Sequence, residues 1–572
     1  MLADLDLALK QPLQLIEKLF LEHDSTLDGF ELRVQESFES LLRDARSQLP
    51  AVTALSNQSK LPRPGSLVRF RAMVQDTGYG TELYRALGAK NQLLMYGIEE
   101  TEENTSTAAH EDYSKLRERQ VFYIVSPPGE TEWVKQKLDG LTGRELESAL
   151  SNLKLSSSAA STPSTSTALP NKFPLPQEPH FGMIAKIYTD LGDKLRSTDV
   201  YEFVGILGET SLSNGFDVFE HGDDAPPPQV VPALHVLYAL PAPSPLDLSS
   251  IQDLDFGSVR HELIEYIAEE ALEGDLEAAE WLLLALIARI HTRHATGLAL
   301  GSLSLNLAFP LQSTSSPSSS SSLAPLLSSL LPSFAPLAPT ITSLNDPSTR
   351  FSPRSRDETL DSGFLQLSRG TNVLIDLINL GEGKLNDTGV RNLRSLSTTI
   401  SQQKLVYEFP FSSFELETDL GFIVASEGKS IVPTDCTVFV EPKRRMTPIE
   451  KGRNSDEEEL RRFRTFIQKV KYEEFSIPPE MSDVIQADFV SRRQASHSGG
   501  GTSGAMTQED LLFRMTVSRL MALSHGKKQL DEESWMKTAE LDERRKERVP
   551  SVVRERQEKE KQAEMQRRKG QA

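Results

Sequence analysis

Apolar residues recur at helical spacing in two stretches between residues 10 and 48. Positions three or four apart lie on one face of a helix, so each stretch predicts a short amphipathic helix. The intervening sequence HDSTLDG supplies polar and glycine residues that typically cap and separate helices. We therefore expect two helices within an N-terminal helical unit, residues 1–58. The apolar positions are Leu13, Ile16, Phe20, Leu32, Val34, Phe38, Leu41 and Leu42.

Beyond Pro64 the hydrophobic period changes to two. Apolar and polar residues alternate in GSLVRFRAMVQD, QVFYIVSPPGE, MIAKIYTD, VYEFVGILGE and ALHVLYALP, as they do in strands with one buried face. A Ser/Thr/Pro-rich stretch, residues 156–179, divides these segments into two groups and has too few apolar residues to order itself. We expect one small β-barrel domain over residues 60–241, with a disordered insertion at about 151–179.

The strongest helical pattern in the chain lies between residues 259 and 293. A run of apolar positions, a break at Gly274 and a second run with a broad apolar face predict two consecutive helices. Trp281 lies in the second run. We expect it to be a core residue rather than a platform for a ligand.

Short apolar segments then alternate with helical ones. Strands are predicted at 298–310, in TNVLIDLINL, in LGFIVASEGKS and in TVFVEP, and a helix in LNDTGVRNLRSLSTTI. The segment KLVYEFPFSSFELE is typical of a hairpin, whereas prolines make LAPLLSSLLPSFAPLAP only weakly helical. Strands that alternate with helices predict an α/β sheet with crossover connections. We assign this sheet to residues 251–442, with a low-complexity insertion at about 311–322.

The remaining chain is predicted to be helical. Apolar spacing in EEELRRFRTFIQKV, MSDVIQADFVSRRQ, TQEDLLFRMTVSRLMALS and DEESWMKTAELDERRKERV predicts a helical domain over residues 453–548, interrupted by a Gly/Ser linker. Residues 549–572 form a tail of alternating charge with little apolar content. The predicted fold class is therefore multidomain α+β.

Composition argues against several classes of partner and site. The net charge of −20 repels phosphate backbones, which argues against direct nucleic-acid binding. The single cysteine, Cys436, excludes an intrachain disulfide and multi-cysteine metal sites, and we expect it to be buried. The N-terminal residues lack a basic n-region, and no apolar run of about 18 residues occurs, so we expect neither a secretory signal nor a membrane span.

The sequence lacks the residues that a P-loop ATPase needs. Such an enzyme holds phosphates and Mg²⁺ with GxxxxGK[ST] between a strand and a helix. This string is absent, and PLQSTSSPSSSSS follows the strand predicted at 298–310. Another strand ends in Asp376, as a magnesium-orienting strand does. The next residue is Leu377, whereas hydrolysis would require a glutamate there to polarise water. We therefore expect no catalytic residue, no cofactor and no metal, and predict that the protein is not an enzyme.

Other candidate sites carry weaker signals. Residues 381–384 (GEGK) and 426–430 (SEGKS) are only faintly similar to phosphate loops, and turns explain their glycines. His291 and His294 lie on one predicted helix without a third metal ligand close in sequence.

Basic residues give two further candidates. Arg69 and Arg71 alternate with apolar residues on a predicted barrel strand, where they could contact single-stranded nucleic acid or form a solvated outer face. Short basic clusters are candidates for nuclear import. These clusters are Lys443, Arg444 and Arg445, then Arg544, Arg545 and Lys546, and finally Arg567, Arg568 and Lys569.

An ordered set of segments carries a resemblance to a known family. PGSLVRFRAMVQD, EGDLEAAEWLLLALIARIHTR, GKLNDTGVRNLRSL and DLLFRMTVSRLMALS resemble the family of minichromosome maintenance complex-binding proteins, over about residues 10–550 apart from the low-complexity insertions. The resemblance implies N-terminal helices, an OB-type β-barrel, a degenerate AAA+-like core without a P-loop and a C-terminal helical lid. Family members can carry an acidic residue after the aspartate matched by Asp376, whereas this chain has Leu377.

The resemblance implies a nuclear, non-catalytic protein of DNA replication and the cell cycle. Such a protein binds subunits of the minichromosome maintenance helicase and reaches chromatin through them. The family is implicated in unloading the helicase from chromatin, in protecting new subunits and in sister-chromatid cohesion. Two alternatives stay open at this point: an ATPase with an unorthodox nucleotide site, and an OB-type binder of single-stranded nucleic acid.

Overall fold

The computed structural model divides the chain into two compact units. The first unit consists of Met1–Pro245, Ser348–Arg369 and Leu405–Leu416, and the rest of the chain forms the second. Two segments from within residues 251–442 therefore belong to the first unit. The bounds predicted for the separate domains stay predictions. The structure describes residues 2–56, 61–88, 91–98, 113–145, 148, 169–212, 229–246, 255–295, 297–310, 322–356, 359–443, 456–498 and 507–549.

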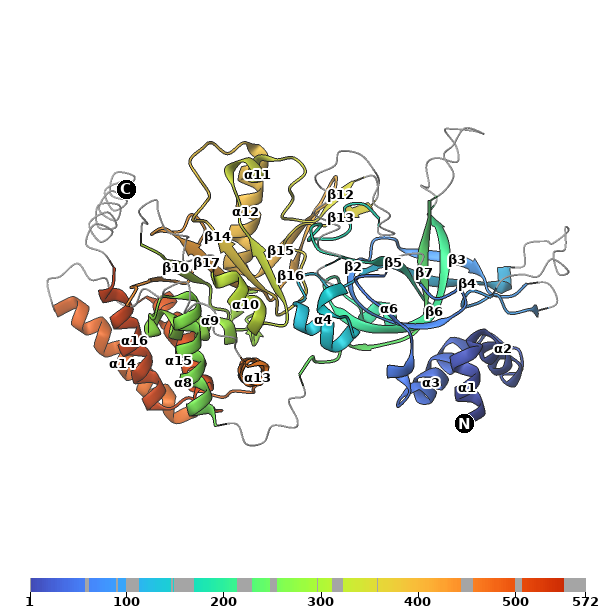
Figure 1. The fold of residues 1–572 in the computed structure, drawn as a ribbon, viewed down its shortest axis with the longest axis horizontal. Coiled ribbons are helices and arrows are strands. Elements are labelled where there is room, and N and C mark those ends of the chain that lie inside the picture. The colour runs from blue at the N-terminus through green and yellow to red at the C-terminus, as the bar shows by residue number, and fades with distance from the viewer. Residues whose placement is uncertain are drawn as a thin grey trace. The chain divides into compact units, whose positions relative to one another are not determined.

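The first unit begins with the helices α1 (Leu2–Lys10), α2 (Pro12–Glu22) and α3 (Phe30–Leu42), shown in blue in Figure 1. The two helices predicted from apolar spacing are confirmed as α2 and α3. They pack through buried residues, and the rings of Phe20 and Phe30 meet edge to face at 5.2 Å. Helical spacing of apolar residues did not predict α1, because apolar and polar residues alternate in its sequence, which is a strand pattern.

Seven strands of the first unit form a sheet that closes on itself. The order is β1-β2-β6-β7-β5-β4-β3, and β2 also pairs with β4, so β2, β6, β7, β5 and β4 form a ring. Within the ring β5 and β7 are parallel, and the other neighbours are antiparallel. The bounds are β1 (Ala51–Val52), β2 (Leu67–Asp76), β3 (Thr81–Arg85), β4 (Leu116–Val125), β5 (Gly182–Ile187), β6 (Val200–Leu212) and β7 (Gln229–Pro241).

Alternating side chains fill the ring. Each of the five sequence segments with period two overlaps one ring strand, so the predicted strands are confirmed. Phe70, Phe181 and Phe203 are fully buried inside, and the first two meet edge to face at 6.0 Å. The short helix η1 (Arg46–Gln48) precedes β1. Other short helices lie between strands: η5 (Tyr113–Lys115), α4 (Glu132–Asp139) and α6 (Leu191–Lys194).

A four-stranded sheet adds segments from late in the chain to the first unit. Its order is β13-β12-β15-β16. Strands β15 and β16 form the hairpin predicted from KLVYEFPFSSFELE, which is confirmed. The bounds are β12 (Arg354–Arg356), β13 (Thr359–Asp361), β15 (Lys404–Glu408) and β16 (Ser413–Glu417).

The second unit contains a five-stranded parallel sheet, as the alternation of strands and helices predicts. Its order is β11-β14-β17-β10-β18, and Figure 1 labels its strands β10, β14 and β17. The edge strand β11 was not predicted, because its prolines suggested a weak helix, yet a proline is tolerated on an edge. The bounds are β10 (Leu305–Ala308), β11 (Phe334–Leu337), β14 (Asn372–Asp376), β17 (Gly421–Ser426) and β18 (Cys436–Phe439).

The strand predicted at 298–310 is wrong in its length. Two strands replace it, β10 and the short β9 (Ala299–Leu300), which pairs with β8 (Thr292–Arg293). Gly301 separates them with a φ of +103°, a backbone conformation that interrupts a continuous strand.

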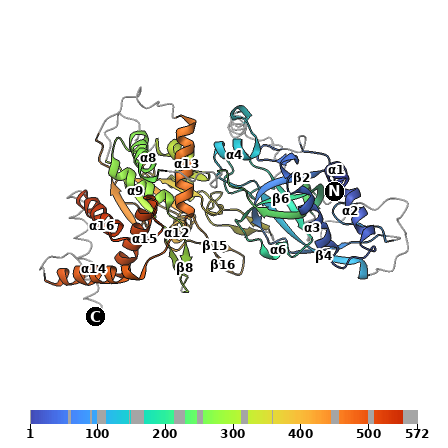
Figure 2. The same ribbon diagram turned by 90° about the horizontal axis from the view of Figure 1, so that it is seen from below.

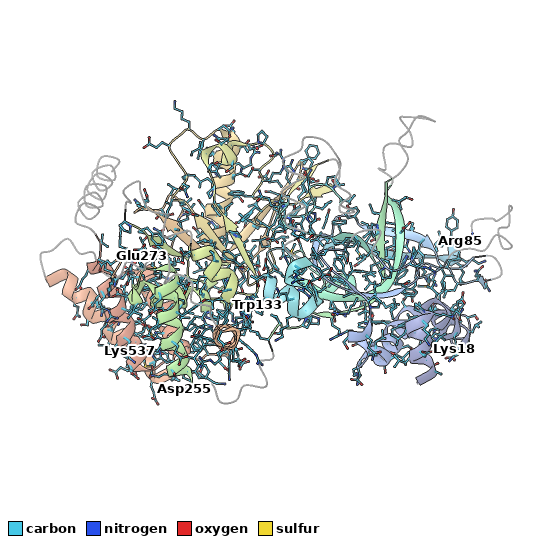
Figure 3. The ribbon with its side chains drawn as sticks, in the orientation of Figure 1. Lys18, Arg85, Trp133, Asp255, Glu273 and Lys537 are labelled. Atoms are coloured by element: carbon cyan, nitrogen blue, oxygen red, sulfur yellow. The ribbon has the colours of Figure 1, made fainter. Side chains whose placement is uncertain are left out.

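Helices surround this sheet, and the predicted pair is confirmed as α8 (Phe256–Ala271) and α9 (Leu276–Ile287). Asp255, labelled in Figure 3, begins α8 by accepting hydrogen bonds from the backbone N–H groups of Gly257 and Ser258. Trp281 is fully buried, as expected for a core residue. The other helices between the strands are α10 (Leu323–Leu330), α11 (Ile341–Asn345) and α12 (Asp387–Gln402).

Four helices end the described chain, as predicted. Helix α13 packs against α8 and α9, and α15 packs against α9 and α16 (Figure 2). They share one apolar cluster with the sheet, which includes Leu283, Phe466 and Leu520. The bounds are α13 (Glu457–Tyr472), α14 (Pro479–Ser498), α15 (Gln508–Ser524) and α16 (Glu532–Glu547).

Two predicted insertions and the tail fall mostly outside the described residues. Residues 149–168, 311–321 and 550–572 are among those not described. Residues 169–179 of the first predicted insertion are described, and there Lys172 and Phe173 are buried, so this part packs against the fold. Among the described helices, none is long and apolar enough to cross a membrane.

Candidate functional site

The first candidate site is the edge of the second unit's sheet at which its parallel strands end. Ligands of open α/β sheets bind outside this carboxyl edge. Asp376 ends β14 there, and its Oδ1 accepts a hydrogen bond from the backbone N–H of Ile378 at 3.0 Å. The aspartate therefore holds the turn that follows its strand. Residues 311–321, which come shortly after β10 in the sequence, lie outside the described residues.

A buried asparagine lies in β10, the strand that neighbours β17 in this sheet. Asn306 of β10 is fully buried, and its Nδ2 donates to the carbonyl of Gly428 at 3.2 Å. Its Oδ1 accepts from the hydroxyl of Ser426 at 2.8 Å. Gly428 has a φ of +87°, so the SEGKS segment forms a tight turn whose carbonyl points back to β10. The polar groups named here serve turns of the chain itself.

The remaining weak candidates are the histidine pair and the single cysteine. Helix α9 ends at Ile287, so the expectation that His291 and His294 share a helix is wrong. In the part of the chain that the structure describes, no group of three His, Cys, Asp or Glu side chains could hold a metal ion. Cys436 is buried as expected, and burial raises the pKa of its thiol to about 12.

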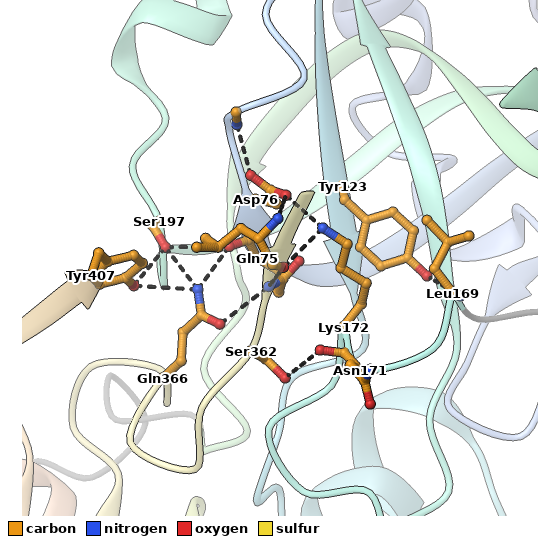
Figure 4. Close-up of polar contacts among 12 residues, drawn as sticks. Gln75, Asp76, Tyr123, Leu169, Asn171, Lys172, Ser197, Ser362, Gln366 and Tyr407 are labelled. Atoms are coloured by element: carbon orange, nitrogen blue, oxygen red, sulfur yellow. Dashed lines mark hydrogen bonds and ion pairs between the residues drawn. The ribbon is translucent and has the colours of Figure 1, made fainter. Parts of the chain in front are cut away.

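The second candidate site is a buried polar network in the first unit, drawn in Figure 4. The Lys172 ammonium lies 2.6 Å from Asp76 Oδ2 at the end of β2, and both side chains are only 3% exposed. The same ammonium donates to the carbonyl of Leu360 at 2.9 Å, and the N–H of Leu360 donates to Asp76 at 3.3 Å. One ion pair thus connects the ring, the described end of the first predicted insertion and β13.

Glutamine side chains extend this network towards the hairpin. Gln366 Nε2 donates to the Gln75 carbonyl at 2.8 Å, and Gln75 Nε2 donates back to Gln366 Oε1 at 3.2 Å (Figure 4). The hydroxyls of Ser197 and Tyr407 lie 2.9 Å apart, and Gln366 Nε2 lies within 3.3 Å of each. Tyr407 belongs to β15, so the base of the hairpin is tied to the ring by buried hydrogen bonds.

Arg69 and Arg71, the candidate nucleic-acid contacts, lie in ion pairs. Arg71 is 7% exposed, and its guanidinium contacts Glu130 and binds both oxygens of Asp139 at 3.0 Å. Arg69 pairs with Glu202 at 3.1 Å. The expectation of a solvated outer face is therefore wrong for Arg71, because acidic residues bury and neutralise it. Contact with nucleic acid by these arginines stays a prediction.

The import candidates are only partly described. Lys443 is exposed, whereas Arg444 and Arg445 lie outside the described residues. In the cluster on α16, Arg544 and Lys546 are exposed. Arg545 is instead held against the fold, where it donates to the Thr437 carbonyl and binds Asp542.

The network in the first unit was not predicted from the sequence. Its members are polar residues far apart along the chain, and Lys172 lies within a Pro-rich stretch that looks like a linker. No local spacing marks such a cluster. The one available signal is a lysine beside apolar residues in NKFPLP, at the end of the low-complexity stretch.

Comparison with known proteins shows the family. The model of a family described as mini-chromosome maintenance replisome factor matches residues 38–153 and 142–549. The chain belongs to this family. The matched residues include parts of both compact units of the chain.

Three relatives carry the same name, mini-chromosome maintenance complex-binding protein. The protein from Danio rerio is 28% identical over 627 residues, which cover 93% of this chain and 96% of the relative. The protein from Homo sapiens is 27% identical over 644 residues and covers 95% of this chain and 97% of its own. The protein from Arabidopsis thaliana is 28% identical over 567 residues, with coverage of 88% and 91%. The family resemblance seen in the sequence is therefore confirmed.

Proposed function

We propose that this protein binds the minichromosome maintenance helicase and regulates it without catalysis of its own. The observation that carries the proposal is the family match over residues 38–153 and 142–549, together with relatives named for binding this complex. Binding of this kind requires a surface that complements the helicase subunits rather than an active site.

The topology supports the finer fold assignments in this proposal. The five-strand ring, with one parallel pair between β5 and β7, suits an OB-type barrel. Numbered along the chain, the strands of the second unit have the order 2-3-4-1-5, which is the order of a P-loop ATPase core. We infer that the second unit is a degenerate AAA+-like core with a helical lid, and that the chain combines the domain types of a helicase subunit.

The domain types of a helicase subunit explain how the protein would act without ATP. Helicase rings are built from heterologous contacts between neighbouring subunits. A protein with a subunit's domains but without GxxxxGK[ST] could occupy one ring position and leave out the nucleotide that completes the contact. The family resemblance implies the further roles that we include in this proposal: unloading the helicase from chromatin, protecting new subunits and supporting sister-chromatid cohesion. These roles place the protein in the nucleus, on chromatin through the helicase.

Two measurements test this function. Full-length tagged protein, purified under native conditions from its own cells, should bring helicase subunits with it in comparable amounts. Reproducible absence of every subunit would overturn the proposal. Calorimetric titration with millimolar ATP should give no heat of binding, whereas binding together with turnover that falls in Asp376→Asn would favour the ATPase alternative.

The nucleic-acid alternative has less support. The basic pair Arg69 and Arg71 is bound to carboxylates, and the chain carries a net charge of −20. Binding of a single-stranded oligonucleotide at low salt, weakened by changing both arginines to alanine, would revive it.

A further inference from the structure

The tip of the β15–β16 hairpin exposes a cluster of large apolar side chains. Phe409, Phe411, Phe414 and Leu416 are 37%, 102%, 57% and 39% exposed. The backbone N–H of Phe409 donates to the carbonyl of Ser412 at 2.9 Å, so Phe411 lies in the tight turn between the strands. The rings of Phe409 and Phe414 meet edge to face at 5.6 Å.

Such a cluster differs from the other exposed apolar residues of the first unit. Leu21, Leu32 and Leu83 lie on α2, α3 and β3, and single exposed leucines are normal on protein surfaces. Four large exposed apolar residues instead lie together within residues 409–416, and the rings of Phe409 and Phe414 are in contact. Patches of this kind mark sites at which another molecule binds.

The base of the hairpin is fixed while its tip is exposed. Leu405 is fully buried, and Tyr407 is buried with hydrogen bonds to Ser197 and Gln366. The aromatic residues of the tip are therefore presented on a rigid support. A preorganised aromatic anchor loses little conformational entropy on binding, which favours its use as a contact.

The charges around the tip distinguish between classes of partner. Residues 405–417 contain Glu408, Glu415 and Glu417 and neither lysine nor arginine. Arg354 lies 3.8 Å from Glu408, and Arg293 lies 3.3 Å from Glu417. Lys404 lies at the start of β15, but the tip, residues 409–416, offers no cation to a phosphate, which argues against nucleic acid as the favoured occupant. A second copy of the chain would bring like charges together.

We propose that the tip of this hairpin, residues 409–416, is a docking anchor that inserts Phe411 into an apolar pocket with a basic rim on a helicase subunit. The proposal rests on the proposed function for the identity of the partner. A projecting aromatic side chain is complemented by a pocket, and such central aromatic contacts carry most of the binding energy of an interface. The basic rim complements Glu415, the one charged residue of the tip.

The test uses full-length protein and purified helicase subunits of the same organism. Phe411→Ala should weaken binding about tenfold or more, and Phe414→Ala should weaken it less, whereas Leu83→Ala, a change at a 65% exposed position on β3, should leave it unchanged. A photoreactive phenylalanine at position 411 should crosslink to a subunit, and the same group at position 83 should not.

The outcomes separate this inference from the proposed function. If wild-type protein binds the subunits and Phe411→Ala binds equally well without a crosslink from position 411, the anchor is refuted while the function stands. If wild-type protein binds no subunit, both fall. Loss of a dimer in Phe411→Ala, measured by sedimentation, or loss of binding to a mixed-sequence oligonucleotide would refute the anchor by identifying a different occupant.

Discussion

The two units of this protein hold their sheets in place with different chemistry. In the first unit, Asp76, Lys172 and Gln366 connect the ring to segments that lie far away in the sequence. In the second, one large apolar cluster joins the sheet to helices on its faces and to the C-terminal helices. Hydrogen bonds and ion pairs are directional, whereas apolar contacts are not. We infer that the polar network determines where the hairpin attaches, and that the apolar cluster mainly supplies stability.

The buried ion pair gives the largest expected effect. Lys172→Met leaves the carboxylate of Asp76 buried without its ammonium partner, so we expect a loss of about 3–5 kcal/mol in the stability of the first unit. Hydrogen exchange measured by mass spectrometry should show faster exchange in β2, β13 and β15, with the second unit unchanged.

Two control variants sharpen this prediction. Lys10→Met removes the exposed pair with Asp6 and should change stability by less than about 1 kcal/mol. The double variant Lys172→Met, Asp76→Asn should be more stable than Lys172→Met alone, because the unpaired charge is gone. Equal instability of the single and double variants would show that packing, rather than charge pairing, holds these segments.

A core variant in the second unit provides the matching case. Leu283 is fully buried, so Leu283→Ala removes apolar contacts and leaves a cavity, at an expected loss of about 2–5 kcal/mol. Exchange should increase in α9 and its neighbours while the ring stays protected. Leu298→Ala, an exposed change in the same unit, serves as the control and should have little effect. Faster exchange in both units would contradict the division proposed between them.

A smaller change tests whether the glutamine contacts position the hairpin. Gln366→Ala removes hydrogen bonds to Gln75 and leaves buried polar groups unpaired, so we expect a loss of about 1–3 kcal/mol. Exchange should increase in the hairpin more than in β6 or β7. Unchanged exchange at residues 405–416 would remove the argument that the network supports the hairpin.

Acid should weaken the first unit through a buried histidine. Burial, together with Arg119 and Lys186, lowers the pKa of His235 to about 3, and its Nδ1 lies 2.6 Å from the Tyr188 hydroxyl. The neutral ring contributes its stability fully above pH 6.5, and this contribution is lost as the pH falls towards 3, because the unfolded chain then binds the proton more strongly. The loss from one proton is about 1.4 kcal/mol per pH unit. His235→Asn should flatten the measured pH dependence of unfolding by that amount, and an unaltered slope would contradict the assignment.

Much of the fold could be predicted because it depends on local periodicity. The five alternating segments become the ring strands, and the run around Trp281 becomes α8 and α9. The failures have physical causes. Apolar and polar residues alternate in α1, which is a strand pattern, and the prolines around β11 suggested a weak helix. The assignment of 348–369 and 405–416 to the first unit depends on contacts between residues that are distant in the sequence.

Less of the candidate site could be predicted. The sequence revealed the missing phosphate loop, because that motif is local and has a fixed spacing. It also located the hairpin whose tip exposes Phe411. The sequence did not reveal that Arg71 is neutralised by Glu130 and Asp139, nor that Lys172 pairs with Asp76, because these partners meet only in the folded chain.

Crosslinking mass spectrometry of the native complex tests the central claim most directly. The claim is that this chain binds the minichromosome maintenance helicase through a subunit-like surface, without using ATP. The predicted result is a set of crosslinks from both units to helicase subunits, retained when ATP is removed, with the hairpin tip among the contacting regions. A native complex that contains no helicase subunit would contradict the account, and so would crosslinks that disappear when ATP is removed.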